Sequence, residues 1–587
     1  MPSVDSQRFV QLFQRTLEKG GKLSTEDLTA LKRAGDKVSG TSEKAAVDGI
    51  LSFLKHDREL DAFETSPVKK ALGVLVGVSS GRLPRDLEKV LTHAVPAANA
   101  RVKDYDLSFD FSKDGAAFPA KAIVTLEKKA TGSTILEVDT DRLTLKDVKV
   151  DGKKVPFTLK DGRVTVEAKG ATAIEFNYTV KPQDVRGNAE TAYGLIRDKY
   201  SGRMWTLTWP YNTGSLFPSN SAPSDGSTSR VTVKVNSETG AVATGTQKGK
   251  TNTFITGAQA PAYAVAVYTS KDFQLGDGGH SHDGVAVSSY GAGASAPEKA
   301  REAYRKAAVD ALDFFGKWLG KYDYGDTLKL VELSGGLGGM EHTAAVAIML
   351  NSARDPESAR ETAVHETAHH WFGDNIRIAN WGDFWMSEGF TNYATYRFYD
   401  AREGPEKLHQ LLDRAKGEVR GALADNPHAL SAPAHTDVNE IFDSIPYEFG
   451  PWMLRMVESE LGRDTFDPML KDWFKKNRQT DVSTREFVAF VKEKTGRDFG
   501  TFFKEWNNIT AVPSLNADVK LNGKSAQVKL EGKKLPGDLA VPLVLEGEGG
   551  KTMKVKVKPG DDVKLEADFV IKHVRWDPER TVLADIR

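Results

Sequence analysis

Cysteine is absent from the 587 residues of the chain, which excludes disulfide bonds, thiol catalysis and thiolate metal ligands. Long hydrophobic segments are absent too. The longest apolar run, residues 71–78, is far shorter than the roughly 20 residues that span a bilayer. An excess of charge of one sign is also missing, because 80 Lys and Arg oppose 81 Asp and Glu. We therefore expect no membrane span and no nucleic-acid partner.

The first residues lack the charged segment and following apolar segment that mark a secretory signal peptide. We therefore expect a cytoplasmic protein, although a mature exported protein without its leader would look the same. The composition, with 40% hydrophobic and 27% charged residues, is that of a globular protein. Its length predicts about three or four domains and leaves the oligomeric state open.

Hydrophobic periodicity divides the chain into four regions. Residues 1–98 have helical periodicity and helix-start signals at Ser24, Pro67 and Pro84. Residues 99–269 alternate apolar with polar side chains between Asp-Gly turns, which predicts a β-rich domain. Residues 270–510 indicate helices with one clear strand at 328–333, after a Gly-, His- and Ser-rich loop at 276–295. Residues 511–587 return to alternating strands.

The segment that carries chemistry lies at residues 363–371, where His365 and His369 stand four residues apart. On a helix they share a face and lie about 6 Å apart along the axis, so both imidazoles can reach one metal ion. Glu366 lies beside them and could take a proton from metal-bound water, whose pKa falls from about 15.7 to around 7. His370 would face away and pack behind the site.

A third ligand is available at Glu388, which follows His369 by 19 residues in another helical stretch. Two imidazole nitrogens and one carboxylate would leave a fourth position of a zinc ion open to water. The alternative is that His365 and His369 are ordinary helix residues and that Glu388 is a charge near a helix N-terminus. A second cluster, His280, His282 and Asp283, could hold another metal, but its glycine-rich surroundings favour a flexible connector.

The motif HExxH, eighteen residues and then Glu resembles the gluzincin zinc aminopeptidases, the family of aminopeptidase N and leukotriene epoxide hydrolase. The similarity continues outside this motif. Residues 338–342 (GGMEH) resemble the Gly-x-Met-Glu-Asn exopeptidase motif, and residues 445–450 (IPYEFG) resemble the Tyr-Glu-Lys-Gly motif. Residues 143–157 are similar to the N-terminal β-domain of the family, and Trp576-Asp577-Pro578 to the close of its β-sandwich.

The resemblance implies a multidomain α/β fold. We expect a helical extension at 1–98, a β-rich saddle-like domain at 99–269, a thermolysin-like catalytic domain at 270–510 and a β-sandwich at 511–587. The catalytic domain would be mainly helical with a small mixed sheet. The resemblance also implies that His365, His369 and Glu388 bind one Zn²⁺ per chain and that Glu366 is the general base.

Further roles are implied for the flanking motifs. Tyr447 would stabilise the oxyanion, and Glu341 would bind the free α-amine of a peptide beside Gly338, Gly339 and Met340. The two glycines would let an edge strand approach the substrate backbone closely. Without the resemblance, Tyr447 is interpreted as a core aromatic residue and Glu341 as a solvated carboxylate.

The sequence departs from the family at several positions. His342 stands where the family has asparagine, and Phe449 where it has lysine. The region that usually adds a Gln or Glu to the amine site reads TLTWPYNTGSLFP at 206–218, so Trp209 or Tyr211 could hold the ammonium by cation–π contact instead. We expect no counterpart to the long helical C-terminal domain that many relatives carry. The N-terminal helices or a second subunit could roof the site, or the site could be more open.

The sequence thus predicts a zinc metallo-aminopeptidase that hydrolyses the N-terminal bond of peptides with a zinc-activated water. A zinc endopeptidase or a dipeptide-releasing peptidase is the nearest alternative, favoured by the missing second amine ligand. An epoxide hydrolase side activity is a weaker alternative. A non-catalytic scaffold of the same fold is a third, although the five residues of the catalytic centre, His365, Glu366, His369, Glu388 and Tyr447, are intact.

Overall fold

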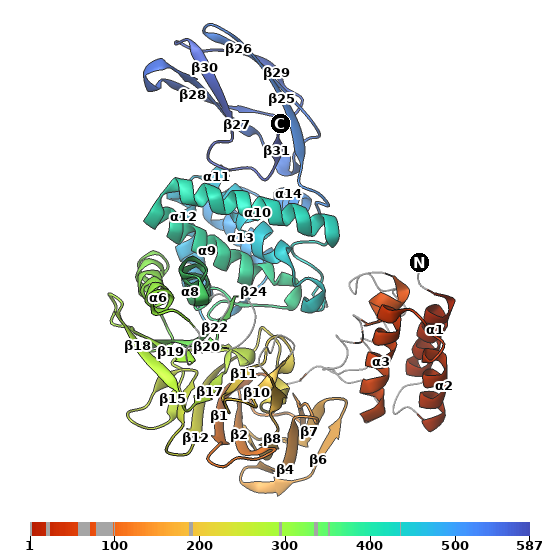
Figure 1. Cartoon of the computed structure of the whole chain (residues 1–587). Helices are drawn as coiled ribbons and strands as arrows, with labels where there is room; N and C mark the ends of the chain where they lie inside the picture. The colour runs from red at the N-terminus through yellow and green to blue at the C-terminus, as the bar shows by residue number, and fades with distance from the viewer. Residues whose placement is uncertain are drawn as a thin grey trace.

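A computed structural model describes residues 3–18, 24–56, 68, 71–77, 98, 100–186, 192–292, 296–333, 338–349, 353–434 and 436–587. Along the chain, helices are followed by a β-rich region, by helices around a small sheet, and by strands again (Figure 1). This order of regions confirms the predicted multidomain α/β fold. Among the described residues, no helix is long and apolar enough to cross a membrane.

The N-terminal helices are α1 (Val4–Glu18), α2 (Thr25–Gly35) and α3 (Thr41–His56). The predicted start at Ser24 is confirmed: the N–H of Asp27 donates to Ser24 Oγ at 3.0 Å, and the N–H of Ser24 donates to Asp27 Oδ2 at 3.1 Å. These helices bury their own apolar cluster, which includes Phe9 and Phe13. The helix starts predicted at Pro67 and Pro84 lie outside the described residues.

The β-rich region forms its sheets from strands with alternating burial, as predicted. One sheet has the order β14-β15-β12-β1-β2-β8-β4-β5 with β16 beside β12, a second β13-β17-β11-β10-β9 and a third β3-β7-β6. The Asp-Gly turns are confirmed, because Asp151 and Gly152 both have positive φ, as a two-residue type I′ hairpin turn requires. The strand bounds are β1 (Val102–Asp110), β2 (Phe118–Leu126), β3 (Ser133–Glu137), β4 (Leu143–Val150), β5 (Lys153–Val155), β6 (Phe157–Lys160), β7 (Arg163–Glu167), β8 (Ala173–Val180), β9 (Gln183–Val185), β10 (Gly194–Asp198), β11 (Met204–Leu207), β12 (Gly226–Lys234), β13 (Gly240–Ala243), β14 (Thr246–Gln247), β15 (Thr253–Ile255), β16 (Ala260–Pro261) and β17 (Val267–Ser270).

The next sheet has the order β18-β19-β20-β22-β21, so β21 lies at its edge. Its strands are β18 (Phe273–His280), β19 (Ala286–Ala292), β20 (Thr327–Leu333), β21 (Gly339–Met340) and β22 (Ala345–Met349). The pairs β19–β20 and β20–β22 are parallel and the outer pairs antiparallel, which is the predicted small mixed sheet. The strand predicted at 328–333 is confirmed as β20.

The loop predicted at 276–295 is wrong, because β18 and β19 pair there as an antiparallel hairpin. The glycines fit close packing against helix α6 (Glu298–Trp318): a Cβ at Gly276 would lie 2.4 Å from Nη1 of Arg305. The composition that indicated a loop therefore reflects close packing at Gly276 and positive φ at Gly279 and Gly284. Among the described residues, His280, His282 and Asp283 form no cluster that could hold a metal.

Helices fill most of the chain between residues 356 and 506 and cover the sheet in Figure 1. Helix α9 lies deepest, since its residues from Trp385 to Tyr399 are all buried. A short π-helix, η6 (Ile445–Phe449), leads into α11. The helices are α8 (Pro356–Ala368), α9 (Trp385–Glu403), α10 (Pro405–Asp425), α11 (Gly450–Leu461), α12 (Arg463–Asn477), α13 (Thr484–Thr495) and α14 (Gly500–Trp506), and the short strands β23 (Arg377–Ile378) and β24 (Asp481–Val482) pair between them.

The C-terminal region has sheets of order β29-β26-β25-β31 and β28-β27-β30, which confirms the predicted β-sandwich. Buried side chains from both sheets, such as Val528 and Leu543, belong to the apolar core that continues into the helices. The strands are β25 (Ser514–Asn522), β26 (Ser525–Glu531), β27 (Val541–Gly547), β28 (Thr552–Val557), β29 (Asp562–Glu566), β30 (Ile571–Trp576) and β31 (Asp585–Ile586).

Candidate metal centre and substrate pocket

Helix α8 and its C-terminal cap present the two histidines of the HExxH motif. Asp355 caps the helix start by accepting the N–H of Ser358 at 2.8 Å, and Pro356 occupies the first turn. One turn apart at the other end, His365 and His369 direct their Nε2 atoms toward each other at 3.0 Å. The local sequence therefore places two imidazoles on one side of the helix, at the edge of a pocket.

Glu388 reaches the same point from the first turn of α9. Its Oε2 lies 3.4 Å from Nε2 of His365 and 3.2 Å from Nε2 of His369. Burial alone raises the pKa of Glu388, but the two imidazoles outweigh this and lower it to about 2, so the carboxylate is ionised. One donor atom from each of the three residues lies within 4.8 Å of the others.

The outward nitrogen of each imidazole has a partner. Nδ1 of His365 lies 2.7 Å from the amide oxygen of Asn392, and Nδ1 of His369 lies 3.0 Å from the carbonyl oxygen of Phe372. Both partners accept, so each Nδ1 carries a proton and each Nε2 points toward the carboxylate of Glu388. Burial lowers the pKa of both imidazoles, but the nearby carboxylates, Glu388 foremost, outweigh this and raise it, so the three groups together favour positive charge between them. This donor set fits Zn²⁺.

Glu366 lies beside these ligands and against the edge strand β21. A Cβ at Gly339 would lie 2.6 Å from Cγ of Glu366 and 2.7 Å from the carbonyl oxygen of Ala347, so only glycine fits there. Gly339 thus allows a close approach to Glu366, and the expected approach to the substrate backbone stays a prediction. Burial raises the pKa of Glu366 to about 7, although the neighbouring histidines work in the opposite direction. A carboxyl group near neutrality suits proton transfer.

Glu341 follows β21 directly, and its side chain is buried in the same pocket. Gly338 has a φ of +90°, a conformation that favours glycine at the turn into this strand. Burial raises the pKa of Glu341, and the nearby carboxylate of Glu388 raises it further. Tyr263 faces Glu341, whose charge adds to burial in raising the pKa of the Tyr263 phenol.

His342 turns away from the pocket into the core. Its Nδ1 lies 2.7 Å from the hydroxyl of Tyr268, which itself donates to the carbonyl oxygen of Ala345 at 2.9 Å. Burial lowers the pKa of His342 to about 3, so the ring is neutral. His370 also packs behind the site, where its Nε2 accepts the N–H of Ala344 at 3.0 Å. Both imidazoles thus hold the segment that follows Glu341.

Tyr447 stands on the π-helix η6 and lines the same cavity. Its ring stacks on the imidazole of His365 with centroids 6.3 Å apart, and its carbonyl oxygen accepts the amide of Asn392 at 2.7 Å. Burial raises the pKa of the Tyr447 phenol, and the carboxylates of Glu388, Glu341 and Glu366 raise it further. The hydroxyl therefore stays protonated and can donate a hydrogen bond.

Asp443 fixes the start of this π-helix. Its Oδ1 accepts the N–H of Ile445 at 2.8 Å, and both of its oxygens lie 3.1 Å from Nε2 of His428. Asn426, just beyond α10, donates to Asp443 at 3.3 Å. These contacts hold the segment that carries Tyr447 against the end of α10.

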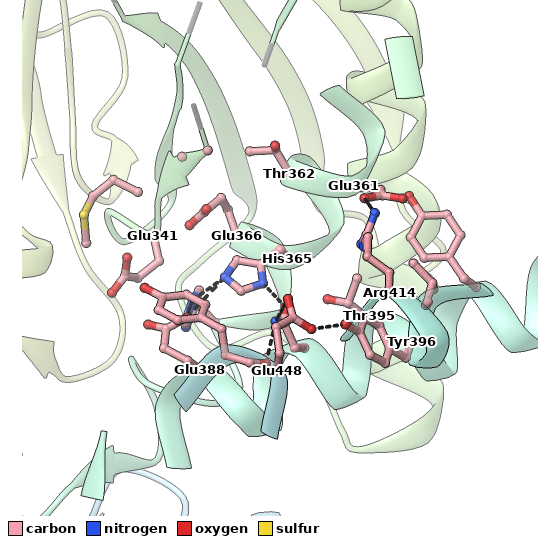
Figure 2. Close-up of a pocket in the computed structure, with 18 of the residues that line it drawn as sticks. Glu341, Glu361, Thr362, His365, Glu366, Glu388, Thr395, Tyr396, Arg414 and Glu448 are labelled. Atoms are coloured by element: carbon pink, nitrogen blue, oxygen red, sulfur yellow. Dashed lines mark hydrogen bonds and ion pairs between the residues drawn. The ribbon is translucent and has the colours of Figure 1, made fainter. Parts of the chain in front are cut away.

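The cavity has a volume of about 430 Å³, within the range of small-molecule and peptide sites. Glu341 and the Glu361–Arg414 pair lie at opposite ends in Figure 2, with His365 and Glu366 between them. The described residues that line it are Trp209, Gly338, Gly339, Met340, Glu341, Glu361, Thr362, His365, Glu366, His369, Glu388, Asn392, Thr395, Tyr396, Tyr399, Leu411, Arg414, Phe442, Tyr447 and Glu448.

The structure thus brings together every residue that the sequence pointed to at this site except Tyr211. The hydroxyl of Tyr211 accepts the N–H of Val438 at 3.0 Å, whereas Trp209 lines the cavity and contacts Phe442 with centroids 4.9 Å apart. Sequence reasoning missed Asn392 and Arg414. The sequence could have predicted Asn392 at the site, because it lies one helical turn after Glu388 on the same face. No local sequence pattern indicates Arg414.

Most of the site lies in a segment that is similar to known proteins. Residues 306–506 match the model of the peptidase family M1 domain. Aminopeptidase M1-B of Oryza sativa subsp. japonica is 30% identical over 204 residues, which are 33% of this chain and 23% of that protein. Probable aminopeptidase 2 of Sulfurisphaera tokodaii is 22% identical over 475 residues, which are 76% of this chain and 59% of that protein. The chain thus spans less than two thirds of the length of these relatives.

Solved structures share the fold. An M1 zinc metallopeptidase mutant from Deinococcus radiodurans, bound to a Tyr-Ser-Ala substrate, has a TM-score of 0.59 and 21% identity over 70% of this chain and 95% of that one. Legionella pneumophila aminopeptidase A, in complex with aspartic acid, has a TM-score of 0.67 and 15% identity over 84% of this chain and 60% of that one.

Proposed function

We propose that this protein is a zinc aminopeptidase that removes N-terminal residues from peptides, because residues 306–506 match the model of the peptidase family M1 domain. The observation that carries the proposal is the convergence of His365, His369 and Glu388 within 4.8 Å, in one cavity with Glu366 and Glu341. The peptide bound to the Deinococcus enzyme supports peptides as the substrate class.

His365, His369 and Glu388 would hold one Zn²⁺ per chain. Bound zinc supplies Lewis acidity, which lowers the pKa of water from about 15.7 to around 7 and polarises a carbonyl group. The carboxylate of Glu366 then receives the proton of the attacking water and delivers it to the leaving amine. Its buried position beside Gly339 fixes the carboxylate for both transfers.

Tyr447 donates its hydroxyl hydrogen bond to the oxygen that gains charge as the scissile carbonyl is attacked. The high pKa of its phenol keeps the proton in place for this purpose. The amide of Asn392 joins the two sides of the site, since it contacts both Nδ1 of His365 and the backbone of Tyr447. Any movement of Tyr447 is therefore coupled to the orientation of His365.

Glu341 binds the α-ammonium group of the substrate and so sets the cleavage point one residue from the N-terminus. A buried carboxylate selects a positive charge because an ammonium group restores the solvation that burial removes. Trp209 lines the same cavity and offers a ring face to the ammonium, which fits the lack of a second acidic side chain in 206–218.

The test uses one peptide with a free and with an acetylated N-terminus, digested by the zinc-loaded protein and followed by mass spectrometry. We expect stepwise loss of residues from the free form alone, and the Glu341→Gln variant should lose this discrimination. Internal cuts in both forms would contradict the proposal and favour an endopeptidase. Release of residue pairs from the free form would indicate a dipeptide-releasing peptidase.

A further inference from the structure

The end of the cavity opposite Glu341 carries a cation. Arg414 extends from α10 toward Glu361 on α8 and lines the cavity there (Figure 2). We infer that Arg414 binds the C-terminal carboxylate of short peptides, so that tripeptides with a free carboxylate are preferred substrates. This inference rests on the proposed function, because it assumes that Glu341 binds the other end of the same peptide.

The charges of the cavity give a bound peptide its direction. Its described lining includes five carboxylates and, besides the two histidines, one cationic side chain, Arg414. An ammonium group finds its partner at Glu341, and a carboxylate meets repulsion along the wall until it reaches Arg414. A short peptide with both termini free therefore matches the cavity in one orientation, with its N-terminal residue at Glu341.

The guanidinium group of Arg414 has more N–H donors than its contact with Glu361 uses. Its Nη1 donates to Oε2 of Glu361 at 3.0 Å, and its side chain is 48% exposed. A guanidinium group has five N–H donors, and a carboxylate can take two of them in parallel. Glu361 also lies 3.5 Å from Nζ of Lys407, so its charge is shared between two cations.

Tyr399 adds a second donor at this end. Its hydroxyl is buried and has no hydrogen-bond partner among the described residues, although the side chain lines the cavity. Burial raises the pKa of the Tyr399 phenol, so the hydroxyl keeps its proton. A buried hydroxyl without a partner is costly, and a carboxylate held by Arg414 would satisfy it.

The distance along α8 sets the length of the peptide. Glu361 precedes His365 by four residues, which is about 6 Å along the helix axis. An extended peptide advances about 3.3 to 3.6 Å per residue. Two residues beyond the scissile bond therefore span about the same length as the separation of His365 from Glu361, the residue that Arg414 contacts. With the one residue on the side of Glu341, the preferred substrate is a tripeptide.

The test compares Tyr-Ser-Ala with its C-terminal amide, using the zinc-loaded full chain and measuring kcat/KM for each. Loss of a charge-assisted hydrogen bond corresponds to about tenfold or more in affinity, so we expect the acid to exceed the amide by at least about tenfold. Arg414→Ala should remove this difference by lowering kcat/KM for the acid alone, mainly through KM. Arg414→Lys, which keeps the charge, should retain part of it.

Arg420→Ala is the matched control. Arg420 lies on the same helix, is 52% exposed and pairs with Asp585 outside the cavity, so its loss should leave the acid-to-amide ratio unchanged. Glu361→Gln removes a competing carboxylate and should raise the ratio. Equal kcat/KM for the acid and the amide, or a ratio that survives Arg414→Ala, would overturn the inference while the aminopeptidase function stands. Failure to cleave either form would instead overturn the proposed function.

Discussion

Glu366 is the residue whose role in proton transfer separates most cleanly from metal binding. Its carboxylate is not part of the group His365, His369 and Glu388, although it forms a second group with Glu341 and His369 whose atoms also lie within 4.8 Å of one another. We therefore expect Glu366→Gln to keep stoichiometric zinc, measured by elemental analysis, while kcat falls about 10²- to 10⁴-fold. Glu357→Gln, on the same helix but outside the cavity lining, is the control and should have near-normal kcat. Near-normal turnover in Glu366→Gln would refute the role.

Tyr447 offers a second test at the level of one atom. Tyr447→Phe keeps the ring that stacks on His365 and removes only the hydroxyl. Loss of a preorganised donor to developing charge costs roughly 3–4 kcal/mol, so kcat should fall about 10²- to 10³-fold. We expect KM to change by less than about threefold, since the bond forms mainly in the transition state. Steady-state kinetics with Tyr200→Phe as an exposed control measure both, and the reverse pattern would contradict the role.

The residues of the site differ in how far the sequence alone could predict them. Spacing of four on one helix is enough to join His365 and His369, because helix geometry fixes their separation. Asn392 could have been found by the same rule from Glu388. Arg414 could not, because its place in the cavity depends on how α10 packs against α8, and no local pattern encodes that packing.

Elements were predictable where periodicity and turn residues agreed. The strand β20 is bounded within one residue of the prediction, although Lys329 and Glu332 interrupt its apolar side chains. The hairpin β18–β19 was missed because its glycines indicate a loop by composition, whereas Gly276 packs closely against Arg305 in the folded chain. Tertiary packing therefore explains why the hairpin was not predicted, just as it explains why the place of Arg414 in the cavity was not predicted.

Strand β20 also carries an ionisable group inside the core. The ammonium group of Lys329 donates to the carbonyl oxygen of Gly245 and lies 5.4 Å from the ring centroid of Phe254. Burial lowers the pKa of Lys329 to about 7, whereas a lysine of the unfolded chain titrates near 10.4. Between these values unfolding takes up a proton, so the free energy of unfolding rises with pH.

We expect this rise to reach up to about 1.4 kcal/mol per pH unit between pH 7 and 10. Urea unfolding at pH 7.5 and 9.5 measures it, and Lys329→Met should lose this contribution because methionine has no proton to bind. Lys317→Met, an exposed position on α6, should keep the dependence of the parent. Equal pH dependence in the parent and in Lys329→Met would refute a depressed pKa for Lys329.

At the scale of the whole molecule, the order of regions could be predicted because each has its own periodicity. Which of these regions supplies the residues of the cavity is a separate question. The described residues that line the cavity lie between 209 and 448, so the β-rich region contributes Trp209 and the helical region most of the rest. The N-terminal helices bury an apolar cluster of their own, which supports a domain that folds independently of the catalytic part.

The roof hypothesis for the N-terminal helices can be tested by deleting residues 1–98. Since the described cavity residues begin at Trp209, we expect the shortened chain to keep kcat/KM within about twofold for peptides of two to six residues. The shortened chain should keep the thermal unfolding transition of the catalytic domain. One apolar core joins the edge of the β-rich region, the helices and the β-sandwich, and the described residues of 1–98 are not part of it. A changed preference for peptide length, with that transition intact, would show that residues 1–98 cover the cavity in solution.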